Sequence, residues 1–312
     1  MTQPPLITIG LTAYNAKETI ARAVRSALDQ DWDNIEVIIV DDASDDGTIE
    51  VLQGLKQQHK QINLITLQDN KGVAHTRNVI IAQAKGEYIA FFDDDDESAP
   101  HRLRVQYNAI KSYGEDNVLC HTARTQNYPN GTQRYEPVPG MDSNNMPHGI
   151  EMALRILTGK PVKGGFGSMA TCSQMANISI YKNLGGFDEG FRRSEDTDFA
   201  VRFAAQGGTF LGVAEALVIQ DMTHGAEKDL KAELNNHLKL LEKHQGFITR
   251  HLPYDFIVQW TTARFDYVQN RKATFFKKMV ALFLSHPILT VKKIIWALPN
   301  RKFHRYQKDF HG

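Results

Sequence analysis

The first hundred residues alternate short apolar segments with amphipathic ones, and this alternation leaves few folds open to the chain. The predicted strands are rich in β-branched residues and occupy residues 6–14, 35–40, 62–67 and 87–92. The predicted helices lie between them, with apolar residues at helical spacing, at residues 16–30, 48–58 and 73–84. Strands joined by single helices form right-handed crossovers and a mostly parallel sheet covered on both faces. We therefore expect an α/β protein.

Local signals mark the ends of several elements. Asn15, followed three residues later by Glu18, predicts a capping box at the start of the first helix. Later in the chain, the composition predicts helices over "RLRVQYNAIKSYG", 194–208 and a segment closing at Gly246, with a strand over "NVLCHTART". Residues 127–150 are rich in proline, glycine and asparagine, which predicts a long loop of the kind that often forms a functional lid.

Composition and charge exclude several classes of protein. Basic and acidic residues both total 36, so the whole chain favours neither nucleic-acid binding nor an acidic tail. Cys120 and Cys172 form no C-x-x-C pattern, which argues against a disulfide framework or structural zinc. The start "MTQPPLITIG" lacks a signal-peptide pattern, and no apolar stretch reaches the roughly 20 residues of a membrane-spanning helix. We expect a cytoplasmic protein that can touch the inner face of a membrane.

Polar clusters follow the predicted strands at the points where the strands end. These clusters are Thr12 to Asn15, Asp41-Asp42, Asn70-Lys71 and Asp93 to Asp96. Ligands of parallel α/β sheets bind outside the carboxyl ends of the strands. The four clusters are therefore expected to share one rim of the sheet.

The run of four aspartates, Asp93 to Asp96, would repel itself without a counter-charge. If the chain stays extended there, Asp93 and Asp95 point to one side and Asp94 and Asp96 to the other. Paired carboxylates suit a hard divalent cation such as Mg²⁺ or Mn²⁺, which also binds phosphate oxygens. The alternative is a solvated acidic turn that ends a strand. For Asp41-Asp42, hydrogen bonds to a nucleobase or ribose stand against ordinary turn chemistry.

Three blocks of sequence carry a family resemblance. They are "ITIGLTAYNAKETIARAVRSALDQDWDNIEVIIVDDASDDGT", "NKGVAHTRNVIIAQAKGEYIAFFDDDDESAPHRL" and "GGFDEGFRRSEDTDFAVRFAAQGG". In this order and spacing the chain resembles the glycosyltransferase family 2 enzymes with the GT-A fold, over about residues 5–225. The resemblance implies an inverting, metal-dependent transferase that moves a hexosyl or N-acetylhexosaminyl group from a nucleotide diphosphate sugar, usually a UDP-sugar, to an acceptor hydroxyl. Cell-surface polysaccharide or lipopolysaccharide synthesis is the expected setting, with a glycan or lipid-linked acceptor.

The resemblance also implies roles for individual residues. Thr12, Ala13, Tyr14 and Asp41 match the positions that hold the base and ribose, and Arg77 and Asn78 match the segment that lines the donor site. The candidate donor-binding residues also include Asn15, Asp42, Lys71, Asp93 and Asp94, of which Asp94 occupies the variable middle position of the DxD motif. Asp93 and Asp95 match the metal-binding DxD motif, and His224 is a candidate third ligand. For Arg77 and Asn78 the alternative is packing at the start of a helix, and for Lys71 and Lys228 it is a solvated surface position.

Asp196, in "SEDTDF", matches the family's catalytic base. An inverting displacement needs a base near the acceptor hydroxyl, on the face opposite the leaving diphosphate. Glu195 and Asp198 are the other candidates. Capping of the helix N-terminus is the alternative for all three acids.

The end of the chain forms a separate electrostatic region. From Arg264 to the C-terminus there are eleven basic and two acidic residues. Residues 274–310 interleave these cations with apolar residues, which predicts peripheral membrane contact with Phe275, Phe276 and Trp296 at the interface. The alternative is a helical subdomain, over 226–312, that packs on the 1–225 catalytic domain or on a second subunit of a homo-oligomer. No recognised nucleic-acid-binding fold accompanies the charge.

Two other functions stay open at this point. One is a sugar-nucleotide nucleotidyltransferase, although "LTAYNAKET" lacks the glycine-rich basic signature that holds a triphosphate. The other is a module that binds a nucleotide sugar without turnover. Within the catalytic domain, residues 1–100 are expected to hold the donor and residues 101–225 the acceptor.

Overall fold

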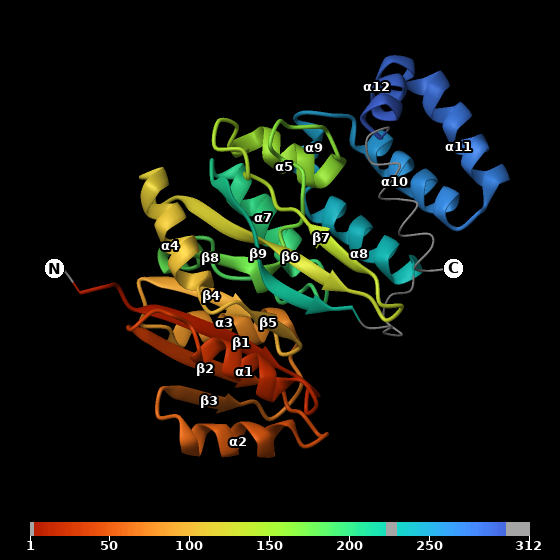
Figure 1. The fold of residues 1–312 in the computed structure, drawn as a ribbon. Coiled ribbons are helices and arrows are strands. Elements are labelled where there is room, and N and C mark those ends of the chain that lie inside the picture. Colours follow the sequence, from red (N-terminus) through yellow and green to blue (C-terminus); the bar gives the residue numbers. More distant parts are fainter. Residues whose placement is uncertain (1–2, 223–229, 298–312) are drawn as a thin grey trace. The chain divides into compact units, whose positions relative to one another are not determined.

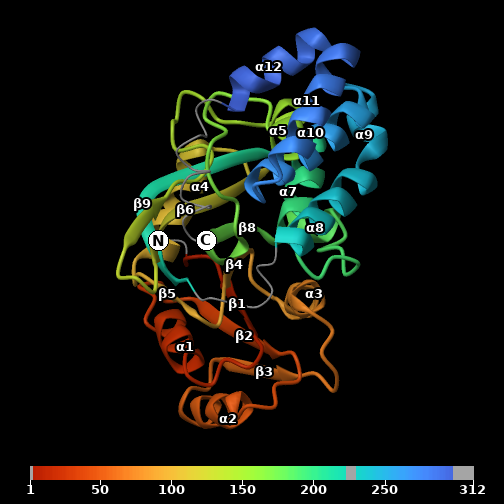
Figure 2. The same cartoon turned by 90° about the vertical axis from the view of Figure 1, so that its right-hand side faces the viewer.

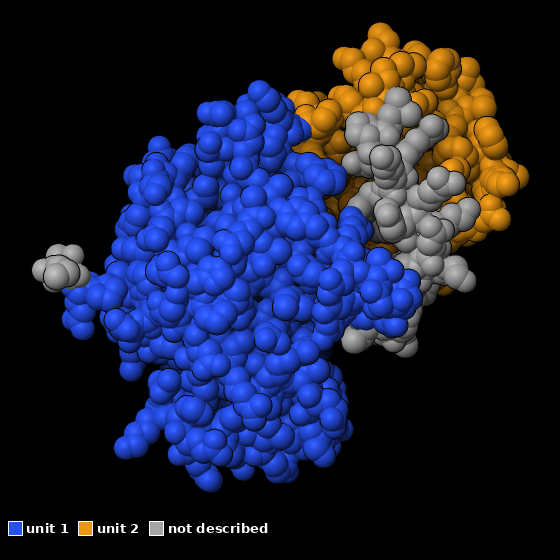
Figure 3. Space-filling view, viewed as in Figure 1, with its two compact units in different colours: residues 1–153, 162–223 blue, residues 154–161, 224–312 orange. Residues whose placement is uncertain are grey.

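The structure, a computed structural model, describes residues 3–222 and 230–297 and divides the chain into two compact units. The first unit comprises Met1–Ala153 and Val162–Thr223, and the second comprises Leu154–Pro161 and His224–Gly312 (Figure 3). The break after Thr223 lies close to the boundary expected at residue 225. Residues 154–161, which sequence reasoning gave to the first domain, belong to the second unit.

The predicted alternation of strands and helices is confirmed in the first unit. Its strands are β1 (Ile7–Ala13), β2 (Ile35–Asp41), β3 (Ile62–Thr66) and β4 (Tyr88–Phe92). Its helices are α1 (Ile20–Leu28), α2 (Thr48–Gln58) and α3 (Val73–Gln83). The four strands are parallel and lie in the order β3-β2-β1-β4 (Figure 1). Their carboxyl ends consequently lie at one edge, where the polar clusters begin.

The rest of the first unit extends this sheet with mixed pairing. The remaining strands are β5 (Asp96–Ser98), β6 (Val118–Asn127), β7 (Gln133–Glu136), β8 (Gln174–Asn177) and β9 (Thr209–Asp221). The remaining helices are α4 (Arg102–Tyr113), α5 (Gly149–Thr158, of which the residues from Leu154 on belong to the second unit), the short 3-10 helix Thr171–Ser173, α6 (Ile178–Asn183) and α7 (Glu195–Ala205). Among the described residues the order is β3-β2-β1-β4-β8-β6-β9-β5, with β7 paired to β6.

The prediction of a long loop over residues 127–150 is wrong in part. β7 lies within it and pairs antiparallel with β6, so that the segment begins as a β-hairpin rather than a structureless loop. The turn between the two strands contains Gly131, and the positive φ angles of Gly131 (80°), Gly140 (83°) and Gly149 (60°) account for the glycines of this segment. The helix α5 was not predicted.

Helices cover both faces of the parallel strands (Figure 2). Ile7, Ile9 and Leu11 of β1 share a buried cluster with Ile20 and other residues of α1. On the opposite face α3 comes so close to β1 that a Cβ on Gly10 would lie 2.5 Å from Ile80 Cγ2. Gly10 therefore allows the helix to approach the strand.

The predicted capping box at Asn15 is wrong. Asn15 has a φ of 50°, and its Oδ1 accepts a hydrogen bond from the Asp45 backbone N–H at 3.0 Å. The helix α1 begins only at Ile20, after Thr19. The asparagine side chain thus joins two loops instead of capping the helix.

The sheet must curl, because β4 and β5 are neighbours in sequence but not in the sheet. Only Asp93 to Asp95 separate the two strands, yet β8, β6 and β9 lie between them in the sheet order. Four strand spacings cover about 19 Å in a flat sheet, whereas the chain from Phe92 to Asp96 spans at most about 14 Å. The far edge of the sheet therefore bends back, and the aspartate turn connects it to the centre.

The second unit is helical in its described part. Its helices are α8 (Leu230–Lys243), α9 (Gln245–Thr249), α10 (Tyr254–Val268), α11 (Lys272–Ser285) and α12 (Pro287–Ala297). The helix expected to close at Gly246 ends at Lys243, and Gly246 lies inside α9. Across residues 3–222 and 230–297, no helix has the length and apolarity needed to cross a bilayer.

Candidate active site

The strand ends form the single rim that the sequence predicted. The Tyr14 backbone N–H, just after β1, donates to Asp94 Oδ2 at 2.8 Å. The Asn15 N–H donates to Ser44 Oγ, in the loop after β2, at 3.0 Å. The loops after β1, β2 and β4 are thus hydrogen-bonded to one another, with the Tyr14 side chain half exposed.

Asp41 holds the loop that follows β2. Its side chain is fully buried, and its two carboxylate oxygens accept hydrogen bonds from Ser44 Oγ at 2.6 Å and Ser44 N–H at 3.1 Å. Ser44 in turn accepts from Asn15. The carboxylate predicted to bind a nucleotide therefore orders the loop beside Asn15.

Asp42 holds the turn that leads into α3. Its carboxylate oxygens accept from the backbone N–H groups of Lys71 at 2.7 Å and Gly72 at 2.8 Å. Gly72 has a φ of 91°, and a Cβ there would lie 2.9 Å from Arg192 Nη1. Arg192 also donates to Asn70 Oδ1 at 2.8 Å. The Lys71 side chain remains exposed at the rim, 4.0 Å from Asp69 Oδ2.

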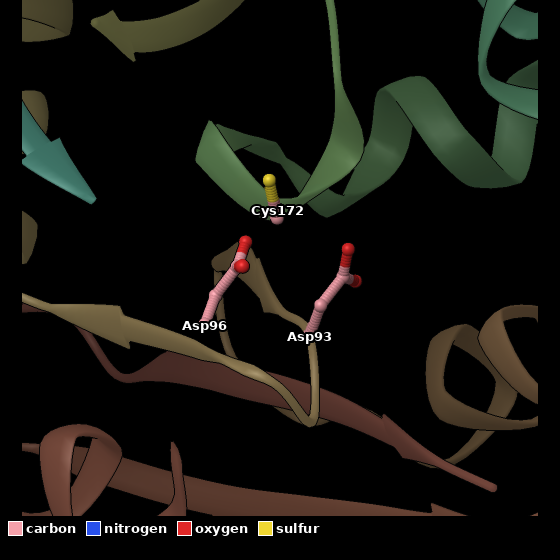
Figure 4. A group of neighbouring side chains, drawn as sticks. All are labelled: Asp93, Asp96 and Cys172. Carbon is pink, nitrogen blue, oxygen red and sulfur yellow. The ribbon is translucent and has the colours of Figure 1, made fainter. Parts of the chain in front are cut away.

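The expectation of an extended chain through the four aspartates is wrong. Asp94 and Asp95 form a turn between β4 and β5, so the side chains do not simply alternate. Asp93 and Asp96, expected on opposite sides, instead converge with Cys172, and their ligand atoms lie within 4.8 Å of one another (Figure 4). The turn arises because β5 must pair with β9, which reverses the direction of the chain.

Burial disfavours the charged forms of the acids around this turn. It raises the pKa of Asp96 to about 8, with Asp93 and Asp95 adding repulsion, while a hydrogen bond from the Cys172 thiol opposes the shift. Burial also raises the pKa of the Cys172 thiol well above its usual range. A hard cation such as Mg²⁺ prefers oxygen to sulfur ligands, so Cys172 is a less suitable ligand for it than the neighbouring carboxylates.

Asp94 and Asp95 differ in their partners. Burial raises the pKa of Asp94 to about 7, although the Tyr14 N–H opposes the shift. Burial, and then the charge of Asp93, also raise the pKa of Asp95. Within the described residues no side chain donates a hydrogen bond to the Asp95 carboxylate. Its backbone oxygen accepts from Arg22 Nη2 at 2.8 Å. The Asp95 carboxylate therefore has lone pairs available for a ligand.

Arg77 connects the aspartate turn to α7. Its guanidinium is buried, with Nη1 donating to Glu195 Oε1 at 2.6 Å and Nη2 donating to Asp93 Oδ1 at 3.3 Å. Burial lowers the pKa of Arg77, but the charges of Asp93, Glu195 and Asp196 outweigh it and raise the pKa above its ordinary value. One buried cation thus joins the two acidic groups that the sequence assigned to the donor and to catalysis.

The first turn of α7 separates its three acids into different roles. Asp198 is buried and pairs with Arg202 Nε at 2.8 Å, so it serves the helix and not a substrate. Burial and the charge of Asp196 raise the pKa of Glu195, while Arg77 opposes the shift. Asp196 is partly exposed, and its Oδ1 accepts from Thr197 N–H at 2.6 Å. Within the described residues nothing donates to Asp196 Oδ2.

Sequence reasoning missed two arginines that support the turn. Arg22 of α1 donates to both the Asp95 carbonyl and Asp221 Oδ2, each at 2.8 Å. Arg102 of α4 is fully buried and donates to the Phe91 carbonyl at 3.0 Å and Ser98 Oγ at 2.9 Å, one on each side of the turn. No sequence motif marks a buried arginine of this kind.

The structure gives less information on the other residues that the sequence singled out. Thr12 and Ala13 end β1, with Ala13 buried, and Asn78 pairs with the Phe187 backbone rather than facing the rim. His224 and Lys228 lie outside the described residues.

Comparison with known proteins identifies the family. The family model described as "Glycosyl transferase family 2" matches residues 8–179, more than half of the chain. The chain belongs to glycosyltransferase family 2. The matched segment contains β1 to β4, the aspartate turn and Arg77.

Individual relatives agree with this assignment over shorter segments. TuaG of Bacillus subtilis (strain 168), named for teichuronic acid biosynthesis, is 39% identical over 102 residues, which are 33% of this chain and 40% of TuaG. The Escherichia coli UDP-Glc:alpha-D-GlcNAc-diphosphoundecaprenol beta-1,3-glucosyltransferase WfaP is 44% identical over 109 residues, 34% of this chain and 42% of WfaP. The chain thus spans about two fifths of the length of these relatives.

A solved structure shares the fold. The mannosyltransferase PcManGT from Pyrobaculum calidifontis, solved with GDP-Man and Mn²⁺, superposes with a TM-score of 0.58 at 16% identity, covering 96% of this chain and 88% of PcManGT. The curled, mixed sheet described above is accordingly the GT-A fold that the sequence predicted.

Proposed function

We propose that this protein transfers a sugar from a nucleotide diphosphate sugar, most simply a UDP-sugar, to an acceptor hydroxyl with inversion at the anomeric carbon. The observation that carries the proposal is the buried Arg77, which bonds Asp93 of the aspartate turn and Glu195 beside Asp196. A donor-binding acid and a candidate base are thereby held at one site. The names of the relatives support a role in cell-surface polysaccharide or lipopolysaccharide synthesis, with a glycan or lipid-linked acceptor.

The acids of the turn fit a divalent cation. Asp95 has a carboxylate to which no side chain of the described residues donates a hydrogen bond. Burial and then the charge of the neighbouring Asp93 raise its pKa, so that a cation would relieve the repulsion between the two acids. Oxygen ligands of this kind suit Mg²⁺ or Mn²⁺. We assign Asp95 and Asp93 as the protein's ligands, with His224 as a candidate third. When bound, the cation supplies positive charge that stabilises the departing nucleotide diphosphate.

The chain's own residues account for the other parts of the reaction. Thr12, Tyr14 and Asn15 line the rim beside the loop that Asp41 and Ser44 order, which suits the base and ribose of the donor. Asp196 Oδ2 takes the proton of the acceptor hydroxyl as that oxygen attacks, while Thr197 holds Oδ1. Glu195, neutralised by Arg77, fixes the position of the first turn of α7.

Residues 1–100 carry the rim and the turn, whereas the α7 acids come from residues 101–225. This distribution supports a donor half and an acceptor half of the catalytic domain.

The test measures donor hydrolysis and donor binding separately. The purified chain is incubated with a panel of nucleotide sugars, with Mn²⁺ or with a chelator, and released nucleotide diphosphate is measured beside a thermal-shift assay of binding. Asp95→Asn should remove the metal dependence, and Asp196→Asn should lower turnover by about 10² to 10⁴ without loss of binding. Glu97→Gln, an exposed acid next to the turn, is the matched control.

Two outcomes would contradict the proposal. Tight binding of one donor without release of nucleotide diphosphate would indicate a binding module. Formation of a nucleotide sugar from a nucleoside triphosphate and a sugar phosphate would indicate a nucleotidyltransferase.

A further inference from the structure

The helices α11 and α12 expose apolar side chains on their outer surface and bury polar ones. Large apolar side chains with 43 to 79% of their surface exposed follow one another along both helices, and we name them the apolar stripe: Phe276, Val280, Phe283, Leu284, Ile288, Val291, Ile294 and Ile295. The spacing of three or four residues places them along one side of each helix. Exposed apolar patches of this extent are uncommon on soluble proteins and mark an interaction surface.

The buried side of the same helices is partly polar. Thr290 is fully buried and donates to the carbonyls of Leu282 and His286 at 2.9 and 2.8 Å. Lys293 is also buried, donates to the Thr158 carbonyl, and lies over the ring of Trp260. Because α12 buries a threonine and a lysine while exposing four isoleucine and valine side chains, its orientation favours an apolar environment outside the unit.

The outward position of the stripe is fixed by ion pairs. Asp266 of α10 is buried and bonds Arg271 Nη2 at 2.8 Å and Lys278 Nζ at 2.6 Å. These pairs hold the first turns of α11 against α10 and leave Phe276 and Val280 exposed. Of the three aromatic residues expected at a membrane interface, only Phe276 is mostly exposed, since Phe275 packs on Tyr267 and Trp296 lies near Lys293.

Charge identifies the kind of partner. Residues 272–297 contain no aspartate or glutamate, and Lys272, Lys277 and Lys292 are exposed. The other two lysines do not add to the outer charge, because Lys278 pairs with Asp266 and Lys293 is buried. Lys292 lines an open hollow of about 400 Å³ together with Phe283, Pro287, Ile288 and Val291, so cationic and apolar groups share one surface. Anionic headgroups above hydrocarbon provide both complements at once. A second copy of the chain, docked through the same face across a twofold axis, would bring the lysines of the two copies together. A nucleic acid would provide no apolar surface to cover the aliphatic side chains.

We infer that the outer face of α11 and α12 docks on an anionic lipid bilayer, with the apolar stripe inserted at the level of the headgroups. The inference goes beyond the transfer reaction, because docking requires neither donor nor metal. It places the protein where a lipid-linked acceptor would be presented.

Co-sedimentation of the full chain with phosphatidylcholine vesicles, with and without phosphatidylglycerol, tests this inference. The wild-type protein should bind the anionic vesicles and bind the neutral ones at least tenfold more weakly. Leu284→Asn/Ile288→Asn should weaken binding by about tenfold or more, because two inserted side chains lose their apolar contact. Lys277→Gln/Lys292→Gln should weaken it by about 25-fold, from about fivefold for each lysine.

Matched controls separate docking from misfolding. Ile150→Asn/Phe166→Asn removes two exposed apolar side chains of the first unit, and Lys56→Gln/Lys85→Gln removes two exposed lysines there. Neither should change vesicle binding. Should the first stripe variant melt at a lower temperature than wild type, Phe276→Ser/Val280→Ser replaces it.

Three results would overturn the inference. One is a wild-type chain that stays in the supernatant with anionic vesicles, as expected if another part of the chain covers the stripe. The second is a stripe variant that binds as tightly as wild type. The third is a wild-type dimer that the stripe variant dissociates, with no vesicle binding by either protein.

Discussion

Arg77 of α3 and Glu195 of α7 are 118 positions apart in the chain, and Arg77 Nη1 donates to Glu195 Oε1 at 2.6 Å inside the protein. The same guanidinium reaches Asp93 at 3.3 Å. Since a buried ion pair contributes little net stability unless its geometry is satisfied, this contact is better explained by positioning. It fixes the distance between the aspartate turn and the first turn of α7.

Substitution of Arg77 should therefore damage both stability and turnover. Arg77→Ala leaves Glu195 and Asp93 without their shared cation and should destabilise the fold by about 3 to 5 kcal/mol. Arg77→Lys keeps the charge but lacks the fork that bonds two acids, so it should lower turnover more than it lowers stability. Urea unfolding and donor hydrolysis measure the two effects. Arg104→Lys, at an exposed pair with Asp31, should change stability by less than about 1 kcal/mol.

Removal of the Asp42 carboxylate should release the turn before α3. Asp42→Ala leaves the Lys71 and Gly72 N–H groups without acceptors and should cost about 2 to 4 kcal/mol. Donor binding, measured by thermal shift, should weaken as the rim loosens. Asp45→Ala is the control, because its side chain is exposed and should alter neither quantity. Equal effects of the two substitutions would contradict the role given to Asp42.

A methyl group at Gly10 should force α3 away from β1. The added Cβ would lie 2.5 Å from Ile80 Cγ2, an overpacking expected to cost about 1 to 3 kcal/mol. Gly54→Ala in α2 should instead stabilise the protein. Nothing lies within 4 Å of a Cβ at this position, and alanine is more favourable than glycine within a helix by about 0.5 to 1 kcal/mol. Thermal melts of the two variants should therefore shift in opposite directions.

Lys293 should make the stability of the protein depend on pH in the alkaline range. Burial lowers its pKa from 10.5 to about 7, and the charges of Arg264 and Arg155 act in the same direction. Between these values the unfolded chain binds more protons than the folded one, so the free energy of unfolding rises with pH and is constant below about 7.

The variant Lys293→Met isolates this effect. From about pH 7 to about pH 9 the difference in unfolding free energy between wild type and variant should change by about 2 to 3 kcal/mol, to the advantage of wild type. Lys292→Met, an exposed neighbour, should show no such change. Parallel pH profiles for wild type and Lys293→Met would show that the amine is solvated.

The sequence predicted the parts of the fold that depend on local pattern. β2, α2 and β4 follow directly from continuous apolar runs and helical spacing, and the shared rim follows from parallel strand direction. The aspartate turn did not, because its reversal depends on pairing between β5 and β9, which are more than a hundred residues apart in the chain.

The same limit applies to single residues. Asn15 has the local pattern of a helix cap, yet a tertiary hydrogen bond to Asp45 determines its conformation. Arg102 belongs to no sequence motif. Its hydrogen bonds to Phe91 and Ser98 form only because the fold brings the ends of β4 and β5 together. Asp196 could be named from the family pattern, whereas the pairing of Asp198 with Arg202 needed the folded helix.

The three-residue link between β4 and β5 has a consequence for how this protein can vary. Inserting one residue among Asp93, Asp94 and Asp95 would lengthen the link that keeps β5 close to β4. Deleting one residue would shorten this link and disrupt the pairing of β5 with β9. The residues that we propose as metal ligands therefore also set the closure of the sheet, and engineering of donor preference is best directed to the surrounding loops.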